Sequence, residues 1–306
     1  MDLFDAFLSS GVRLTTPILL AALACLPTQW TKDLNIGLEG AMLFGAFGGV
    51  VFGLMFQSVA LGIAATVIAG IISGLIFGYV ITRLNVNVFV AGIALNIFAA
   101  AATVYLLRSF FGVKGTLSDP GIPSLPVYNI PFIKDIPVIG AIVSGHTILT
   151  YLSWVLVAVM VFAVRRTVLV RRLKAAGEHP AALAAAGGNV NRMRVWAQVW
   201  CFALCALAGA QLSVGQLTLF TEGMTNGLGF VALAAVIFCR GKVKWLAVMS
   251  VIFGLASAVA VQVNDAVVAP QFAQMLPYVI AFIGLIVLAK TSKDGGIRIA
   301  TPTMEA

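Results

Sequence analysis

The stretch RRTVLVRRLKAAGEHPAALAAAGGNVNRMR, residues 165–194, interrupts a series of apolar segments and decides how the rest of the chain is arranged. It is rich in arginine, and Glu178 is its only acid. Its centre, AALAAA, follows Pro180 and precedes Gly187–Gly188, and these residues suit the first turn of a helix and the position after its end. The stretch therefore predicts a short helix between two basic flanks. Because so short a helix is unstable alone in water, we expect it to dock against a partner.

The composition indicates a membrane protein. Hydrophobic residues make up 61% of the 306 residues and charged residues only 10%, whereas soluble proteins contain about 25% charged residues. The mean hydropathy is +1.05. At about 20 residues for each span, the chain has room for about 8–10 membrane-spanning helices. We therefore predict an all-α fold, a polytopic transmembrane helix bundle that forms one transmembrane domain over residues 1–306.

Nine apolar segments are candidates for these spans. They lie at about residues 12–30, 35–56, 59–82, 86–111, 147–164, 193–216, 226–239, 243–262 and 272–290. The first segment contains Pro17 and Pro27, and a proline inside a helix removes a backbone hydrogen bond. This segment is therefore a candidate for a broken helix that re-enters the membrane.

The basic residues predict the orientation of the bundle. With residues 165–194 in the cytoplasm, strict alternation of the spans puts the other main basic positions on the same side: Lys32, Arg83, 240–244 and 290–298. This asymmetry follows the positive-inside rule, so the net charge of +8 does not indicate nucleic-acid binding. Residues 112–146, which contain five prolines, then form an external loop, and the N-terminus is external by the same count. In an alternative interpretation, residues 165–194 are only a solvated loop that sets this orientation.

Two apolar segments carry a glycine at every fourth residue. The stripes consist of Gly45, Gly49 and Gly53 and of Gly70, Gly74 and Gly78. Small residues at this spacing let helix backbones approach closely in lipid, where no hydrophobic effect drives association. The stripes predict a compact bundle, and we expect them to have a structural role and no role in binding.

Four polar residues in or beside the apolar segments are candidates for a solute pathway, because polar groups are costly in lipid. Asn35 and Glu39 lie four residues apart, Asn96 lies in the fourth segment, and Asn226 begins the seventh. The glycine-rich surroundings of Asn35 and Asn226 are similar, as if each half of the chain contained a broken helix of the kind found in transporters. Alternatively, Asn35 and Glu39 cap the second helix at the cytoplasmic edge.

The sequence gives almost no support to a catalytic, nucleotide or metal site. It lacks G-x-x-x-x-G-K-[ST], so it cannot bind ATP through a P-loop. His146 and His179 lie outside the apolar segments, which leaves no histidine for a metal or proton site in the membrane. We therefore expect no enzyme activity, no metal and no cofactor. An ion-coupled secondary transporter would need intramembrane acids or histidines, and only Glu39 is a candidate, which makes this class the least favoured transport function.

Four blocks of sequence resemble one protein family. NIGLEGAML (35–43), GIALN (92–96), AAGEHPAALAAAGGNV (175–190) and GMTNGLGFVALAAVIF (223–238) occur in the expected order. They are similar to the permease subunits of bacterial ABC importers of the ribose-type branch. The similarity is greatest to nucleoside-importer permeases that work with basic-membrane-protein-type receptors, and it spans about residues 12–290.

This resemblance implies a role for the short helix and a set of partners. The coupling block of such permeases, which contacts the ATPase, matches this chain at Gly177, Glu178, Pro180, Ala181, Ala182 and Gly187. The implied partners are an ATP-binding subunit, a second and non-identical permease subunit, an extracytoplasmic substrate-binding protein and membrane lipid, with no nucleic acid. The implied location is the bacterial cell (inner) membrane, which the chain crosses several times.

The resemblance also ranks the solutes. A nucleoside moved into the cytoplasm is favoured, because the NIGLEG block is most similar to that branch. A simple sugar such as a pentose is the alternative, and another small polar metabolite is a third possibility.

Overall fold

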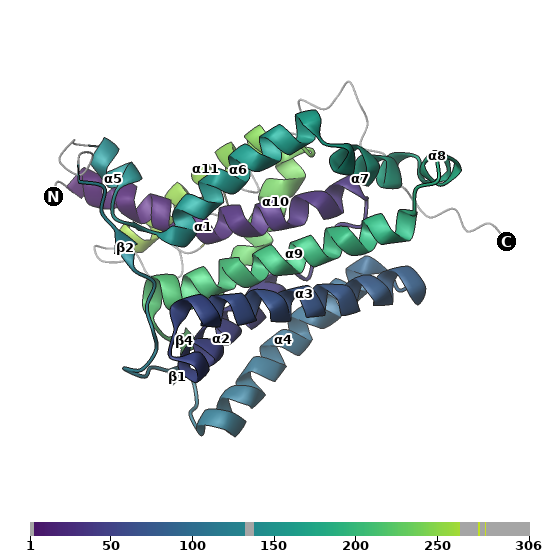
Figure 1. Ribbon diagram of the computed structural model, residues 1–306. Helices are drawn as coiled ribbons and strands as arrows, with labels where there is room; N and C mark the ends of the chain where they lie inside the picture. Colours follow the sequence, from purple (N-terminus) through teal and green to yellow (C-terminus); the bar gives the residue numbers. More distant parts are fainter. Residues whose placement is uncertain (1–2, 132–137, 264–274, 276–278, 280–306) are drawn as a thin grey trace.

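The computed structural model describes residues 3–131, 138–263, 275 and 279, and its architecture is a bundle of helices (Figure 1). The α-helices are α1 (Leu3–Trp30), α2 (Leu38–Phe56), α3 (Val59–Arg83), α4 (Val88–Phe111), α5 (Ile139–Val143), α6 (Ile148–Arg166), α7 (Val168–Glu178), α8 (Pro180–Ala185), α9 (Val190–Leu212), α10 (Leu228–Cys239) and α11 (Val243–Val263). A π-helical turn, η1 (Ser213–Leu217), extends α9. The strands are β1 (Thr116–Leu117), β2 (Val127–Tyr128), β3 (His146–Thr147) and β4 (Phe220–Thr221).

Seven helices of the described chain are long and apolar enough to cross a membrane, namely α1, α2, α3, α4, α6, α9 with η1, and α11. The apolar helix α10 is shorter. Eight of the nine predicted segments correspond to one of these helices, and the ninth, at 272–290, lies outside the described residues apart from 275 and 279. The predicted polytopic helix bundle is confirmed.

Helix α9 lies in the middle of the bundle, and both glycine stripes pack against it. A Cβ atom added to Gly45 of α2 would lie 2.5 Å from the carbonyl oxygen of Ala206. One added to Gly74 of α3 would lie 2.8 Å from Cα of Val199. Both distances are too short for a side chain, so the glycines allow α2 and α3 to pack directly on the backbone of α9.

Helix α1 is continuous, which corrects the expectation that its prolines could break it. Pro17 has no N–H to donate to the carbonyl oxygen of Arg13, four residues earlier. Instead, Nε2 of Gln216 in η1 donates a hydrogen bond of 2.7 Å to that oxygen. A side chain more than 200 residues away in sequence therefore replaces the backbone bond that the proline removes.

The second proline of α1 is accommodated in the same way. Pro27 leaves the carbonyl oxygen of Leu23 without its helical donor, and Nε1 of Trp200 in α9 donates to it at 3.3 Å. Proline is tolerated inside a membrane helix when neighbouring helices satisfy the freed carbonyl group. The packing of α1 against α9 therefore keeps α1 intact through both prolines.

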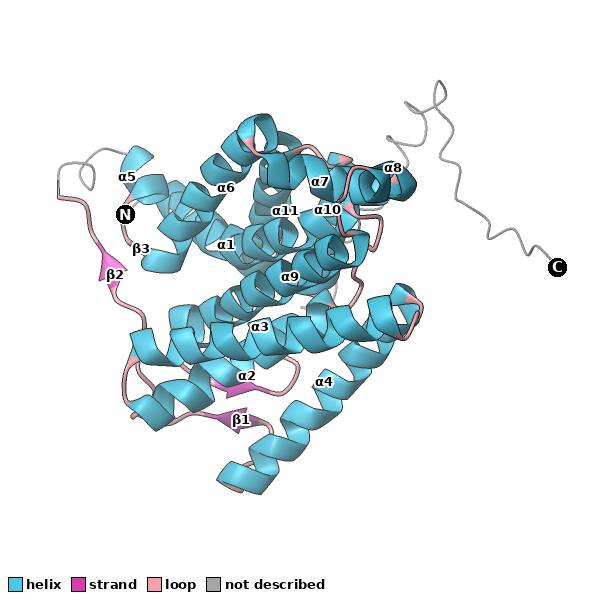
Figure 2. Ribbon diagram, turned by 45° about the vertical axis from the view of Figure 1, so that its right-hand side comes forward, coloured by secondary structure: helices cyan, strands magenta, loops and turns pink. Residues whose placement is uncertain are grey.

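The segment after α4 is tied to the chain before α10 and to the start of α6 (Figure 2). Strand β1 pairs antiparallel with β4, and β2 pairs antiparallel with β3. Oε1 of Glu222 accepts a hydrogen bond of 3.1 Å from the backbone N–H of Gly115 and lies 3.6 Å from Nη2 of Arg108. These strands and the beginning of α1 lie at the end of the bundle opposite α8 (Figure 1).

Candidate functional site: the helix ends around Glu39 and the α7–α8 region

The carboxylate of Glu39, in the first turn of α2, binds the beginning of α10. Its Oε1 accepts hydrogen bonds from Oγ1 of Thr225 at 2.6 Å and from the N–H of Gly227 at 2.7 Å. Its Oε2 accepts a third from the N–H of Gly229 at 2.8 Å. An acid at a helix N-terminus is stabilising because the free N–H groups there carry partial positive charge. Glu39 thus joins the N-terminal ends of α2 and α10.

The structure brings together the two glycine-rich clusters whose similarity suggested broken helices. Helix α2 follows the non-helical residues 31–37, and α10 follows an irregular segment that contains β4. A Cβ atom added to Gly229 would lie 2.6 Å from the backbone nitrogen of Glu39, so the two helix ends are in direct contact. Glu39 was predicted as a possible cap of α2, the helix in which it lies. In the structure it instead caps the N-terminal end of α10, by accepting from Gly227 and Gly229.

Asn96 and Asn35 hold the backbone that leads into α2. The side chain of Asn96, in α4, accepts a hydrogen bond from the N–H of Gly40 at 2.8 Å and donates one to the carbonyl oxygen of Ile36 at 3.1 Å. Asn35 is completely buried, and its Oδ1 accepts from the N–H of Gly37 at 2.7 Å. Both side chains therefore stabilise the non-helical entry into α2.

The four predicted pathway residues do not have equal surroundings. Glu39 and Asn96 are half-buried at helix contacts, and Asn35 is enclosed. Asn226 is exposed and has a left-handed backbone with φ of 41°. Three of the four thus surround the N-terminal end of α2, and their role along a solute pathway stays a prediction.

A cavity of about 750 Å³ lies between α2, α3, α4 and α9, and its chemistry does not suit a polar solute. Phenylalanine and aliphatic side chains form most of its wall, and none of the four predicted pathway residues is among its described lining residues. Its two hydroxyl residues, Thr66 and Ser73, donate to carbonyl groups of their own helix at 2.7 and 2.9 Å. The wall therefore has almost no hydrogen-bonding groups left for a solute.

The basic stretch, residues 165–194, contains α7 and α8, and the sequence predicted only α8. Helix α8 has Pro180 in its first turn, and the N–H groups of Gly187 and Gly188 close its end by donating to Ala184 and Leu183 at 2.9 and 2.8 Å. The predicted short helix is confirmed. Leu183 is its buried residue, whereas Pro180, Ala181, Ala182 and Gly187 are exposed. Helix α8 projects from one end of the bundle (Figure 1). Its exposed residues are small.

Helix α7 connects α6 to α8 and buries one face. Val170, Leu173, Ala176 and Gly177 are buried, and the intervening Arg171 and Arg172 are exposed. This spacing of three to four residues is typical of an amphipathic helix. Helix α7 was not predicted, because its arginines were interpreted as a basic flank of the short helix and as markers of orientation.

Gly177, one of the predicted coupling residues, packs on the end of α1. A Cβ atom there would collide with the carbonyl oxygen of Trp30 and would lie 3.0 Å from Cα of Thr31. The Trp30 ring has Nζ of Lys174 over its face, 5.6 Å from the ring centroid. Glu178, the next residue, is exposed. Helix α7 thus touches the point where α1 ends and the connection to α2 begins.

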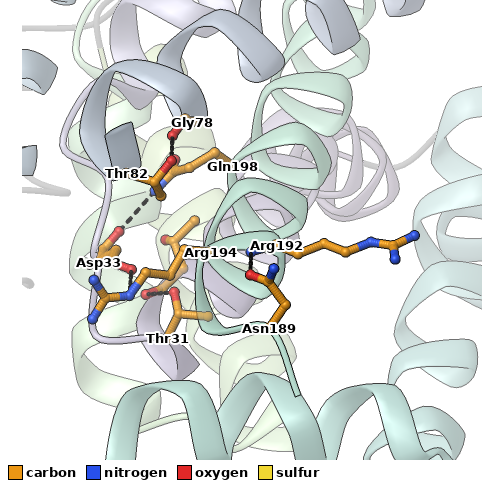
Figure 3. Close-up of polar contacts among 9 residues, drawn as sticks. Thr31, Asp33, Gly78, Thr82, Asn189, Arg192, Arg194 and Gln198 are labelled. Atoms are coloured by element: carbon orange, nitrogen blue, oxygen red, sulfur yellow. Dashed lines mark hydrogen bonds and ion pairs between the residues drawn. The ribbon is translucent and has the colours of Figure 1, made fainter. Parts of the chain in front are cut away.

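The connection between α1 and α2, residues 31–37, is bound to α9 by polar side chains (Figure 3). Oδ2 of Asp33 lies 3.1 Å from Nε of Arg194, and Nε2 of Gln198 donates to the carbonyl oxygen of Asp33 at 3.1 Å. Nδ2 of Asn35 donates to Oε1 of Gln198 at 3.0 Å. Burial raises the pKa of the Asp33 carboxyl, although the Arg194 charge and a hydrogen bond from Thr31 act in the opposite direction.

Comparison with known proteins identifies the family. The family model described as "Branched-chain amino acid transport system / permease component" matches residues 7–288 of this chain. The chain belongs to this permease family. The match covers every helix span described above except the first residues of α1.

Individual relatives of this permease are transport proteins of the ABC class. The Nucleoside ABC transporter permease protein NupC of Lactococcus lactis is 30% identical over 283 residues, which cover 89% of this chain and 88% of the relative. The Guanosine ABC transporter permease protein NupQ of Bacillus subtilis is 30% identical over 80% of this chain and 78% of the relative. The Putative glucose ABC transporter permease protein TsgC13 of Haloferax volcanii is 28% identical over 84% and 78%.

The family membership defines what the permease does in general terms. It is the multi-pass translocation subunit of an ABC transporter, and ATP is hydrolysed by separate ATPase subunits. Such a transporter also includes a substrate-binding protein. The predictions of an ABC permease and of a non-enzymatic subunit are confirmed.

Three of the polar residues between α1, α2 and α9 in the permease were not predicted from the sequence, although Asn35 was. Arg194 was counted only as a charge, and neither Asp33 nor Gln198 was considered. One signal was available, because Gln198 is a polar residue inside an apolar segment and needs a partner there. Its partners, in residues 31–37, were not predictable from spacing, since more than 160 residues separate them from Gln198.

Proposed function

We propose that this permease moves a nucleoside into the cytoplasm. Two relatives that are 30% identical over 80–89% of the chain carry the proposal, because their names specify a nucleoside and guanosine. The chemistry around the N-terminal end of α2 supports it. Asn35 and Asn96 are uncharged, and three donors already satisfy the Glu39 carboxylate. The entry into α2 therefore presents no unpaired charge, which suits a neutral solute better than an ion.

A sugar is the second candidate. It is favoured by the Haloferax volcanii relative, which is named as a putative glucose permease and covers a similar share of this chain at 28% identity. Uptake measured side by side with guanosine, uridine, ribose and glucose separates the two classes.

The assembly that we propose contains two different permease subunits in a bacterial inner membrane. Residues 165–194 lie on the cytoplasmic side, and α8 with Gly177, Glu178, Pro180, Ala181, Ala182 and Gly187 contacts the ATPase subunit. The exposed small residues of α8 support this contact, because they leave its surface open to a partner. Residues 112–146 form the external loop, near which the substrate-binding protein delivers the solute.

The decisive experiment compares the isolated chain with the assembled transporter. In vesicles, the chain alone is expected to hydrolyse no ATP and to accumulate no solute, because it has no P-loop. With its ATPase, second permease and binding protein, it is expected to accumulate labelled guanosine or uridine only when ATP is supplied. Concentrative uptake by the isolated chain under a proton or sodium gradient would instead identify a secondary transporter.

The pathway residues are open to a separate test. We propose that Asn35, Glu39, Asn96 and Asn226 border the solute pathway, and Asn96→Leu tests this. Because the leucine cannot bond to Gly40 or Ile36, we expect a raised apparent KM for the solute or a loss of transport, with normal membrane insertion. A KM equal to that of the wild type, with transport reduced only in proportion to the amount of protein, would restrict Asn96 to a structural role.

A further inference from the structure

We propose that the ion pair between Asp33 and Arg194 transmits movement from α7 and α8 to the helix ends joined by Glu39, and we call it the coupling ion pair. The inference rests on the proposed function, in which a separate ATPase drives solute movement. Coupling between distant sites requires an element with two arrangements that both sites influence. The contacts of residues 31–37 identify that element in three steps.

The first step is the contact between α7 and the connection from α1 to α2. Gly177 packs against the carbonyl group of Trp30 and against Thr31, with no room for a side chain between them. Nε1 of Trp30 donates a hydrogen bond of 3.1 Å to the carbonyl oxygen of Gly241, which attaches this point to the turn between α10 and α11. A displacement of α7 therefore acts directly on residues 31–37.

The second step is the attachment of residues 31–37 to α9. Two sets of contacts make this attachment, one firm and one weak. The firm contacts are those of Gln198, whose side chain donates to the carbonyl oxygen of Asp33 at 3.1 Å and accepts from Nδ2 of Asn35 at 3.0 Å. The weak contact is the coupling ion pair. Nε of Arg194 and Oδ2 of Asp33 are 3.1 Å apart, but neither atom has a hydrogen bond of good geometry, although both are enclosed.

The surroundings give Arg194 space to leave Asp33. Both residues border a cavity of about 350 Å³, whose wall also includes Lys32, Asn85 and Asn87. The Arg194 side chain is 34% exposed, whereas that of Asp33 is 13% exposed. The guanidinium group can therefore move into a polar, water-accessible space, while Asp33 stays with its loop. This provides the second arrangement that a reversible contact needs.

The third step leads from residues 31–37 to α2 and α10. The carbonyl group of Ile36 and the N–H of Gly40 are both bound by Asn96, so the end of the connection and the first turn of α2 move together. Glu39 lies in that turn and holds the N-terminus of α10 through three hydrogen bonds. A change at the coupling ion pair is thereby carried to the helix ends beside the proposed pathway.

The test uses the complete reconstituted transporter and measures solute moved per ATP hydrolysed. The double variant Asp33→Asn with Arg194→Gln removes the ion pair without leaving an unpaired charge, which would be costly in a partly buried site. We expect ATPase activity to persist and the solute-to-ATP ratio to fall about ten-fold, within the range of coupling between distant sites. A merely structural role would lower both activities together and leave the ratio unchanged.

Two further variants serve as comparisons. Arg192→Gln makes the same replacement two residues away on α9, where the side chain points away from Asp33 (Figure 3), and it is expected to keep the wild-type ratio. Arg194→Lys keeps the charge and is expected to retain a higher ratio than the double variant. The inference is overturned if the double variant keeps the wild-type ratio or if Arg192→Gln lowers it equally.

A second measurement leaves the ion pair intact. Spin labels on cysteines at Lys32 and Arg192, which are both exposed, report the separation of the connection from α9. We expect the distance to differ between the nucleotide-free and ATP-bound transporter, and an unchanged distance contradicts the inference. Failure of the wild-type transporter to take up any solute contradicts the proposed function instead, so the two failures are distinguishable.

Discussion

Gly177→Trp is expected to abolish solute uptake while the permease still inserts into the membrane. A side chain at position 177 collides with the carbonyl group of Trp30 and with the backbone of Thr31. Overpacking a well-packed site commonly costs about 1–3 kcal/mol, and backbone atoms are less able to move aside than side chains. The indole must therefore displace α7, and with it α8, from the end of α1. Uptake of labelled solute and the amount of permease in the membrane fraction are the measurements.

Val168→Trp is the matched control for this substitution. Val168 lies in the first turn of the same helix and is 53% exposed, so a large side chain there meets no backbone. We expect uptake close to that of the wild type. Normal uptake by Gly177→Trp would show that the contact between α7 and α1 is not needed for coupling.

Glu39→Ala is expected to have the second large effect, because it removes the group that joins α2 to α10. The N–H groups of Gly227 and Gly229 and the hydroxyl of Thr225 all lose their acceptor. A hydrogen bond to a charged group contributes about 1.5–3 kcal/mol, and the three are not additive. We expect loss of uptake and a lower Tm of the purified permease, measured by thermal unfolding in detergent.

Two glutamine variants sharpen the interpretation of that result. Glu39→Gln keeps the shape and one acceptor oxygen, so we expect an effect between those of the wild type and Glu39→Ala. Glu222→Gln is the comparison, because this half-buried carboxylate is 3.6 Å from the exposed Arg108 and accepts one hydrogen bond, from Gly115. An ion pair with an exposed partner contributes little to stability, so we expect a smaller loss of Tm than for Glu39→Ala. If Glu39→Ala unfolds at the wild-type Tm and transports normally, the contact between the N-terminal ends of α2 and α10 is needed neither for stability nor for transport.

Local composition was sufficient to predict several elements of this permease. A span is an uninterrupted apolar run of about 20 residues, and burial in lipid imposes that length wherever the run occurs. Helix α8 was predictable from Pro180 and Gly187, because the conformations that these residues favour do not depend on distant partners. The glycine stripes predicted close helix packing for a similar reason, since they remove side chains from a helix face. The sequence could not name α9 as the helix that both stripes contact.

Contacts between distant residues decided the rest. Pro17 and Pro27 suggested a broken first helix, but Gln216 and Trp200 supply the missing donors and α1 remains whole. Glu39 was recognised as an unusual carboxylate, yet its partners lie 186–190 residues away, on the end of α10.

The sequence by itself thus determined a polytopic helix bundle with a short helix inside a basic break, because apolar length, proline and glycine act locally. Only the tertiary structure decided which polar groups satisfy one another and which helix ends meet. A backbone or side-chain group buried among apolar helices must find a partner, and which partner it finds depends on how the whole bundle packs.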